Sequence, residues 1–144
     1  MSKTLLDLAH FLEYKANAIS REASDTSKRV ALAIVQNLTA VTPVDTSTAL
    51  SNWHVSLHFP VDITIPPHSF GHLGSTKAQS AGQTIGEARN VLSNKRPGDK
   101  LYISNNVDYI QKLNEGSSKQ EPAGFVERAI IVGRLKGKSF KLGN

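Results

Sequence analysis

The chain contains no cysteine, and its 144 residues include one tryptophan and one methionine. The absence of cysteine excludes a disulfide framework, a thiolate nucleophile and a cysteine-ligated zinc site. Aromatic residues make up 6 % of the chain and hydrophobic residues 39 %, which is a lean supply for a core. We therefore expect one domain, part of whose burial is completed by other subunits.

Long hydrophobic runs are also lacking. The longest, Val30–Val35, has six residues, whereas a helix needs about 20 to cross a bilayer. The opening residues lead directly into a segment with Asp7, Glu13 and Lys15, which is not the pattern of a secretory signal. The sequence predicts no membrane-spanning segment and no membrane partner.

The charge is mildly basic and is uneven along the chain. Lysine and arginine together number 17 against 12 aspartates and glutamates, a net charge of +5. The last twelve residues have no acid and carry four cations, Arg134, Lys136, Lys138 and Lys141. We predict a single domain over residues 1–132 and a basic C-terminal arm over residues 133–144. This arm could neutralise DNA phosphates, or it could be solvated or docked on a neighbour.

A repeat of three and four residues marks the first third of the chain as helix. The repeat has eleven positions, Leu5, Leu8, Leu12, Ala16, Ile19, Ala23, Ser27, Val30, Ile34, Leu38 and Val41, and all but Ser27 are apolar. Eleven residues per three turns is the period of a nearly straight α-helix. One helix over residues 4–41 would be about 57 Å long, against a radius of gyration of roughly 14–15 Å for a compact domain of this size. We expect it to project beyond its domain, with a kink at residues 24–27 as the alternative.

The remaining segments predict an α+β fold, in which the long N-terminal helix packs on a small, mostly antiparallel sheet with additional short helices. Pro43 ends the first helix, and Asp45 or Thr46 caps a short helical turn. The expected strands are residues 53–59, 61–65 and 101–104, and the expected helices are residues 76–94, 107–113 and 125–132. In the first strand Trp53, Val55, Leu57 and Phe59 share the buried face. In the helix over 76–94 the buried side is Ala78, Ala81, Ile85, Ala88 and Leu92.

Catalytic and metal-binding patterns are weak. His54 and His58 are four residues apart, as are His68 and His72, but the first pair would lie about 13 Å apart on a strand and the second falls in a loop. No Gly-x-Ser-x-Gly elbow or phosphate-binding glycine loop is present in the sequence. We expect no enzyme, no metal and no cofactor; a hydrolase remains a third interpretation, without an assembled motif.

Two segments, residues 42–53 and 103–126, combine turn and cap residues with large anchors. Asn105 and Asn106 can satisfy backbone groups where a strand passes into a helix. Trp53 and Tyr109 are expected to be core anchors. Pro122 is expected in the first turn of the last helix.

At these residues the chain resembles the small neck proteins of tailed bacteriophages, known as tail-completion, head–tail connector or minor tail proteins. The matching residues, in order, are Pro43, Val44, Asp45, Thr46, Asn52, Trp53, Asn105, Asn106, Tyr109, Leu113, Gly116, Ser118, Gln120, Pro122, Gly124 and Phe125. Departures from the family pattern occur at Ser47, which replaces a glycine, at Asp108, which replaces a proline, and at Asn114 and Glu121.

The resemblance implies a ring-forming structural protein of the virion, assembled in the host cytoplasm, that joins the tail to the DNA-filled capsid. We expect a homohexamer, with a dodecamer as second choice, and neighbours among neck, tail-terminator, tail-tube and portal-side proteins. The interface candidates are Asp45, Trp53, Asn105, Asn106, Tyr109, Ser118, Lys119, Gln120, Pro122 and Phe125. The candidates for contact with DNA in the lumen are Arg134, Lys136, Lys138 and Lys141. The alternative function is a small nucleic-acid-binding protein that acts through its basic C-terminal arm.

Overall fold

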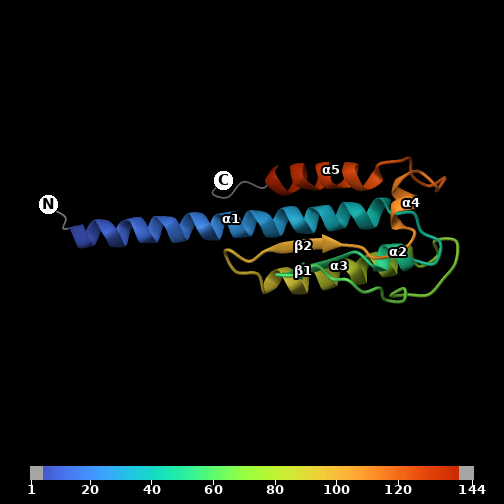
Figure 1. Ribbon diagram of the computed structural model, residues 1–144, viewed down its shortest axis with the longest axis horizontal. Helices are drawn as coiled ribbons and strands as arrows, with labels where there is room; N and C mark the ends of the chain where they lie inside the picture. Colours follow the sequence, from blue (N-terminus) through green and yellow to red (C-terminus); the bar gives the residue numbers. More distant parts are fainter. Residues whose placement is uncertain (1–4, 140–144) are drawn as a thin grey trace.

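The computed structural model describes residues 5–139, apart from the side chains of Leu6, Lys138 and Ser139. A single helix, α1 (Leu5–Val41), runs along most of the length of the molecule (Figure 1). The helix is uninterrupted from Leu5 to Val41 (Figure 1), which confirms the prediction of one long helix over the alternative of a kink at residues 24–27. The helix ends where the backbone N–H and the side-chain hydroxyl of Thr42 both donate to the carbonyl of Leu38, directly before Pro43.

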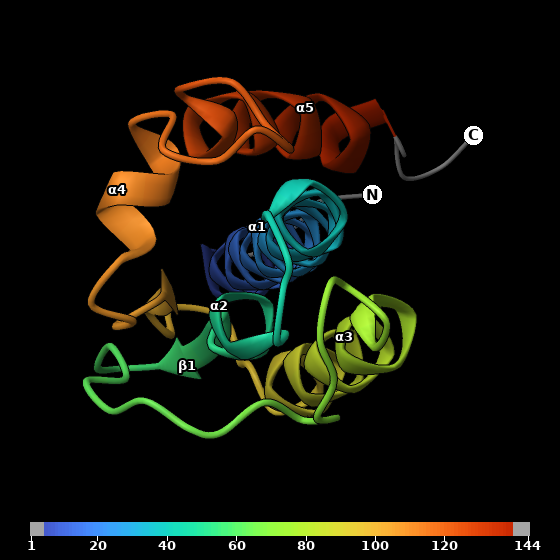
Figure 2. The same ribbon diagram turned by 90° about the vertical axis from the view of Figure 1, so that its right-hand side faces the viewer.

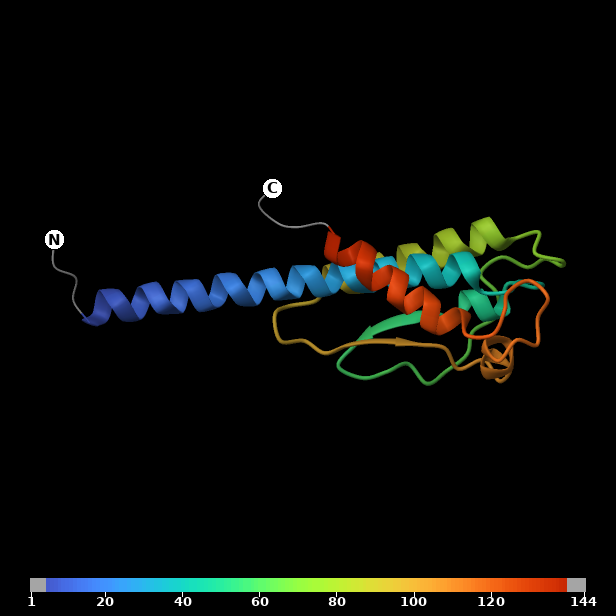
Figure 3. The same ribbon diagram turned by 90° about the horizontal axis from the view of Figure 1, so that it is seen from above.

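The first half of α1 stands apart from the rest of the chain (Figures 1 and 3). We call residues 5–23 the arm; its described side chains are exposed except for Ala18, which is half-buried. Ser24 is the first buried residue of the helix. Among residues 5–139, no helix is both long and apolar enough to span a bilayer.

The second half of α1 is the centre of the fold. Helix α5 (Phe125–Ser139) lies on one side of it, and the strands and α3 (Lys77–Ser93) lie on the other (Figure 2). One apolar cluster joins α1, α3 and the sheet around Val35, Val55 and Leu92. A second joins α1 to α5 around Leu38, Trp53 and Ala129. The α+β class, with a long N-terminal helix and additional short helices, is confirmed.

The sheet consists of two antiparallel strands, β1 (His54–Leu57) and β2 (Leu101–Ser104), with Val55 opposite Ile103. The alternation predicted for β1 is correct at Trp53 and Val55, which are buried. It is wrong at Phe59, which is 79 % exposed. The chain turns away from the sheet at His58, whose φ of +72° lies in the left-handed region.

Residues 61–65 were expected to form a further strand, and this prediction is wrong. The segment runs as an extended loop that is tied to the fold by side chains. Asn52 exchanges two hydrogen bonds with the backbone of Ile65, at 2.7 and 2.8 Å, and Ser104 donates to the carbonyl of Val61. These side chains replace the ladder that a third strand would have made.

Helix α3 lies where it was expected, and its buried side agrees with the prediction at Ala88 and Leu92 but differs in the first half of the helix. Its buried residues are Ser80, Thr84, Ala88 and Leu92, whereas Ala78 is exposed. Small hydroxyl side chains are buried here because they find partners: Thr84 donates to the carbonyl of Leu50, and Ser80 accepts from the N–H of Ser69. Two short helices, α2 (Thr48–Ser51) and α4 (Ile110–Asn114), complete the fold.

Helix α5 is longer than expected and continues to Ser139 instead of ending at Val132. Gly133 and Gly137 are buried against α1. A Cβ atom added at Gly133 would lie 2.5 Å from the Cα of Ile34, and one at Gly137 would lie 2.5 Å from the Cα of Val30. The two glycines therefore let the helices approach closely, and residues 133–139 belong to the packed fold rather than to a free arm.

Candidate functional site

The two segments that carry the family resemblance meet at one end of the molecule. The side-chain amide of Gln120 bonds both backbone groups of Val44, and Asn105 donates to the carbonyl of Ala49 at 2.8 Å. Asn105 also accepts from the N–H of Val107 at 3.1 Å, so it fixes the exit of β2 as predicted. Two segments separated by about fifty residues of sequence thus contact each other directly.

A pocket of about 270 Å³ lies between the two segments. Residues 43–49 form one wall, and Tyr109, Leu113, Ser118 and Gln120 form the other. The lining includes the hydroxyl residues Thr46, Ser47, Thr48 and Ser118, the aromatic Tyr109 and one carboxylate residue, Asp45.

The 43–49 wall is built on an unusual backbone. Ser47 takes a left-handed φ of +70°, the conformation that glycine adopts most easily, and its hydroxyl lies 2.9 Å from that of Thr76. Ser47 therefore adopts the left-handed conformation at the position where the resemblance led us to expect a glycine. The expected cap at Asp45 or Thr46 is wrong, because Ser47 is the residue that precedes α2, and it makes no side-chain capping bond.

Asp45 acts on a different segment. Its carboxylate accepts from the N–H of Leu73 at 2.6 Å, and its carbonyl accepts from the N–H of Gly74 at 2.9 Å. Asp45 thus holds the loop that enters α3. Leu73 itself is 93 % exposed. The loop therefore presents an apolar side chain to solvent at the end of the molecule that holds the pocket.

Of the interface candidates, two belong to the core. Trp53 is buried and donates from Nε1 to the Thr42 hydroxyl at 2.8 Å, and Phe125 is fully buried. Neither is available to a partner. Tyr109, which was expected to be a core anchor, is 41 % exposed and lines the pocket, so that expectation is wrong.

The remaining candidates lie on the surface. Asn106 donates to the carbonyl of Val61, Ser118 accepts from the N–H of Gln120 at 3.1 Å, and Lys119 is exposed. Pro122 is exposed and precedes α5 by three residues, so its predicted place in the first turn of that helix is wrong. The first turn is instead anchored by Asn114, whose side chain accepts from the N–H of Val126 at 2.9 Å.

Of the four basic candidates for contact with DNA, only two have side chains within the described part of the chain. Arg134 and Lys136 are exposed on α5. The side chain of Lys138 and the whole of Lys141 lie outside the described residues. The cations that can be placed therefore project from a packed helix.

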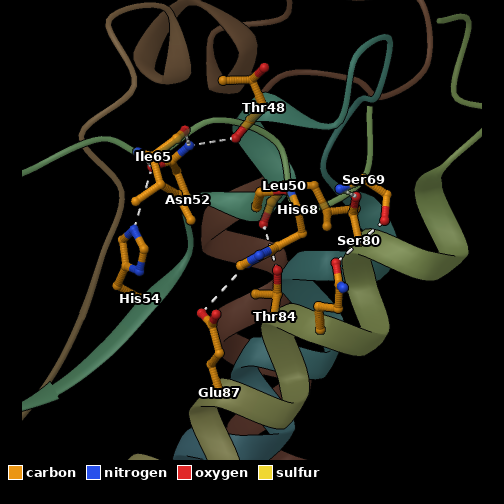
Figure 4. Close-up of polar contacts among 12 residues, drawn as sticks. Thr48, Leu50, Asn52, His54, Ile65, His68, Ser69, Ser80, Thr84 and Glu87 are labelled. Carbon is orange, nitrogen blue, oxygen red and sulfur yellow. Dashed lines mark hydrogen bonds and ion pairs between the residues drawn. The ribbon is translucent and has the colours of Figure 1, made fainter. Parts of the chain in front are cut away.

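A polar cluster that sequence reasoning missed lies between α2, β1 and α3 (Figure 4). His68 Nε2 lies 3.5 Å from the carboxylate of Glu87, and His54 lies 3.4 Å from the Oδ1 of Asn52. Burial lowers the pKa of His54, Glu87 acts in the opposite direction, and His68 lowers it further. The spacing of the histidines gave no signal for this arrangement, because Glu87 comes from another element.

Within the described part of the chain, no group of three or more histidines, aspartates and glutamates could hold a metal ion. The cluster of His54, His68 and Glu87 joins the loop over 61–68 to α3, which is a structural role. His58, four residues from His54, points to a different place and lies 3.9 Å from Asp99.

Comparisons with protein-family models, with curated proteins and with solved structures find no match for this chain.

Proposed function

We propose that this chain is a structural subunit of a tailed-bacteriophage neck, which assembles into a ring where the tail joins the DNA-filled capsid. The observation that carries the proposal is the arm. Nineteen residues of helix stand outside the fold, with Leu5, Leu12 and Ile19 each more than half exposed. A soluble monomer seldom leaves such a surface uncovered, and this supports a subunit whose burial is completed in an assembly.

The resemblance supplies the kind of assembly. Its two segments lie together around the pocket of residues 43–49 and 109–120, with Gln120 and Asn105 making the contacts between them. Shared turn and cap residues that converge in space favour a common structural unit over chance matches. We therefore place the subunit in the virion, with neck, tail-terminator, tail-tube or portal-side proteins as its neighbours.

In a ring the same heterologous contact repeats from copy to copy until it closes. We propose six copies, with twelve as the second choice. No catalytic step, metal or cofactor belongs to this function. Arg134 and Lys136 would contact genomic DNA without sequence specificity if α5 faces the lumen.

The test is the mass and shape of the purified full-length protein, measured by native mass spectrometry and by negative-stain imaging. We expect closed rings of six or twelve copies, and the labelled protein at the head–tail junction of intact particles. A protein that stays monomeric both in solution and in purified particles would refute the proposal. Tight duplex-DNA binding by the monomer, with a steep salt dependence, would favour the nucleic-acid-binding alternative.

A further inference from the structure

The tip of the arm carries an apolar stripe that nothing in the fold covers. Leu5, Leu8 and Leu12 are 86 %, 48 % and 57 % exposed. Steps of three and four residues place these side chains on one side of the helix. From Leu5 to Leu12 there are seven steps of 1.5 Å, which is about 10.5 Å along the helix axis.

An apolar groove of about 330 Å³ lies on the folded half of the same helix. Val30, Ala31 and Ile34 form its floor, Leu101 and Ile103 of β2 form one side, and the hydroxyl residues Thr26 and Ser27 lie at its arm-facing end. From Thr26 to Ile34 the groove extends about 12 Å along α1. Its length therefore matches the stripe of Leu5, Leu8 and Leu12.

The stripe and the groove cannot meet within one molecule. Both lie on α1, which is one uninterrupted helix, and Leu8 is 19 residues from Ser27. At 1.5 Å per residue this is a separation of about 28 Å along a rigid element. Only a second molecule can bring such a stripe into such a groove.

The charges of the two partners are opposite in sign. The arm, residues 5–23, carries three carboxylates and two cations, a net charge of −1, whereas residues 24–144 carry nine carboxylates and fourteen cations, a net charge of +5. Electrostatic attraction would therefore guide the arm of one copy toward the body of another. Two arms placed side by side would bring like net charges together.

We propose that the Leu5–Leu12 stripe of one copy inserts into the α1–β2 groove of a second copy. This inference rests on the proposed function, because it names the contact that would join the subunits of the ring. It specifies one interface and does not depend on the number of copies. The contact is heterologous, because arm and groove are different surfaces, and it can therefore repeat around a ring.

Crosslinking of single-cysteine variants tests the contact directly, since the natural chain has no cysteine. Leu8→Cys and Ser27→Cys proteins are prepared separately, mixed, and treated with a short bismaleimide reagent. Any link between these positions must join two copies, because of their separation on α1. Gln36→Cys, exposed on the same helix, replaces Ser27→Cys in the control mixture.

We expect the Leu8–Ser27 product to exceed the Leu8–Gln36 product at least tenfold, with the linked peptides identified by mass spectrometry. Equal yields of the two products would overturn the inference. Rings that are seen in images but give no Leu8–Ser27 link would overturn this contact and leave the ring intact. A Leu8–Ser27 link in a particle of only two copies would support the contact and refute the ring.

A charge-insertion pair gives an independent test. The double variant Leu8→Lys with Leu12→Lys places two charges on the stripe, and His10→Lys with Asn17→Lys places two on the other side of the arm; all four residues are exposed. Circular dichroism should show both variants folded. We expect the stripe variant to weaken self-association at least tenfold relative to the control variant, by analytical ultracentrifugation. The same weakening in both variants would overturn the inference.

Discussion

The side-chain amide of Gln120 pairs with the backbone of Val44 as a neighbouring strand residue would. Oε1 accepts from the N–H of Val44 at 2.9 Å, and Nε2 donates to its carbonyl at 3.0 Å, across 76 residues of sequence. Val44 follows the end of α1, and Gln120 lies in the loop before α5. One side chain therefore joins the two walls of the pocket.

This pairing predicts a specific cost for Gln120→Glu. A carboxylate has no proton to donate, so the carbonyl of Val44 would lose its partner and face a negative charge. We expect the free energy of unfolding to fall by about 1–2 kcal/mol. Urea denaturation followed by the fluorescence of the one tryptophan would measure the change.

The matched control is Gln79→Glu, which makes the same chemical change at an exposed position of α3. We expect it to stay within about 0.5 kcal/mol of the natural protein. If the two variants lose the same stability, the Gln120–Val44 pairing contributes nothing specific.

The elements best predicted from sequence are those with a strong local pattern. The period of α1 holds over eleven positions, and its second-half members such as Ile34 and Leu38 are buried. The same pattern did not reveal that its first half would be exposed, because periodicity reports the face of a helix and not whether a partner covers it. The expectation that the helix projects from its domain came instead from the predicted length of the helix.

The sequence-based predictions were wrong where side-chain hydrogen bonds determine the local structure. Residues 61–65 have strand-like composition, yet Asn52 and Ser104 hold them as a loop. The buried face of α3 was predicted correctly at Ala88 and Leu92, but Ser80 and Thr84 were missed because they are polar, while the fold gives each a hydrogen-bond partner. Such pairings depend on tertiary contacts that no local pattern records.

The candidate site was found in part. The sequence identified both segments and the role of Asn105, but it could not show that Gln120 would reach Val44. It also placed Tyr109 in the core, because a large aromatic four residues from Leu113 resembles a buried helix face. Helix α4 begins only at Ile110, and this late start leaves the ring of Tyr109 at the pocket.

Trp53 is expected to be the most costly single side chain to remove. It is buried, and its Nε1 donates to Thr42, whose hydroxyl in turn donates to the carbonyl of Leu38 at 2.5 Å. Trp53→Ala should lower the free energy of unfolding by about 3–5 kcal/mol, measured by thermal denaturation with circular dichroism. Phe59→Ala is the control at an exposed aromatic and should change stability by no more than about 0.5 kcal/mol. An unchanged melting temperature for Trp53→Ala would contradict this account of the core.

Gly133 should tolerate no side chain. An alanine Cβ would lie 2.5 Å from the Cα and 2.6 Å from the backbone nitrogen of Ile34, so α5 would have to move away from α1. We expect Gly133→Ala to cost about 1–3 kcal/mol, in spite of alanine's higher helix propensity. At Gly82, within α3, an added Cβ would meet nothing within 4 Å, so Gly82→Ala should gain up to about 1 kcal/mol. Chemical denaturation of both variants provides the comparison, and a stabilising Gly133→Ala would exclude the close helix contact.

Acid should destabilise the fold partly through His54. Burial lowers the pKa of His54 in the folded protein below its ordinary value of 6.5, with Glu87 opposing this and His68 adding to it. Above pH 6.5 the residue is neutral in both states and has no effect. As the pH falls below 6.5, the unfolded chain takes up the proton more readily, so stability declines until the folded-state pKa is passed.

The variant His54→Gln removes the titratable imidazole and keeps a polar side chain. We expect the melting temperature of the natural protein to drop more between pH 7.5 and pH 5.5 than that of His54→Gln, because every other titrating group is common to both. His72→Gln, a change at an exposed histidine, should show the same drop as the natural protein. If His54→Gln and the natural protein respond identically to acid, His54 does not contribute to the pH dependence, and the decline must originate in other groups.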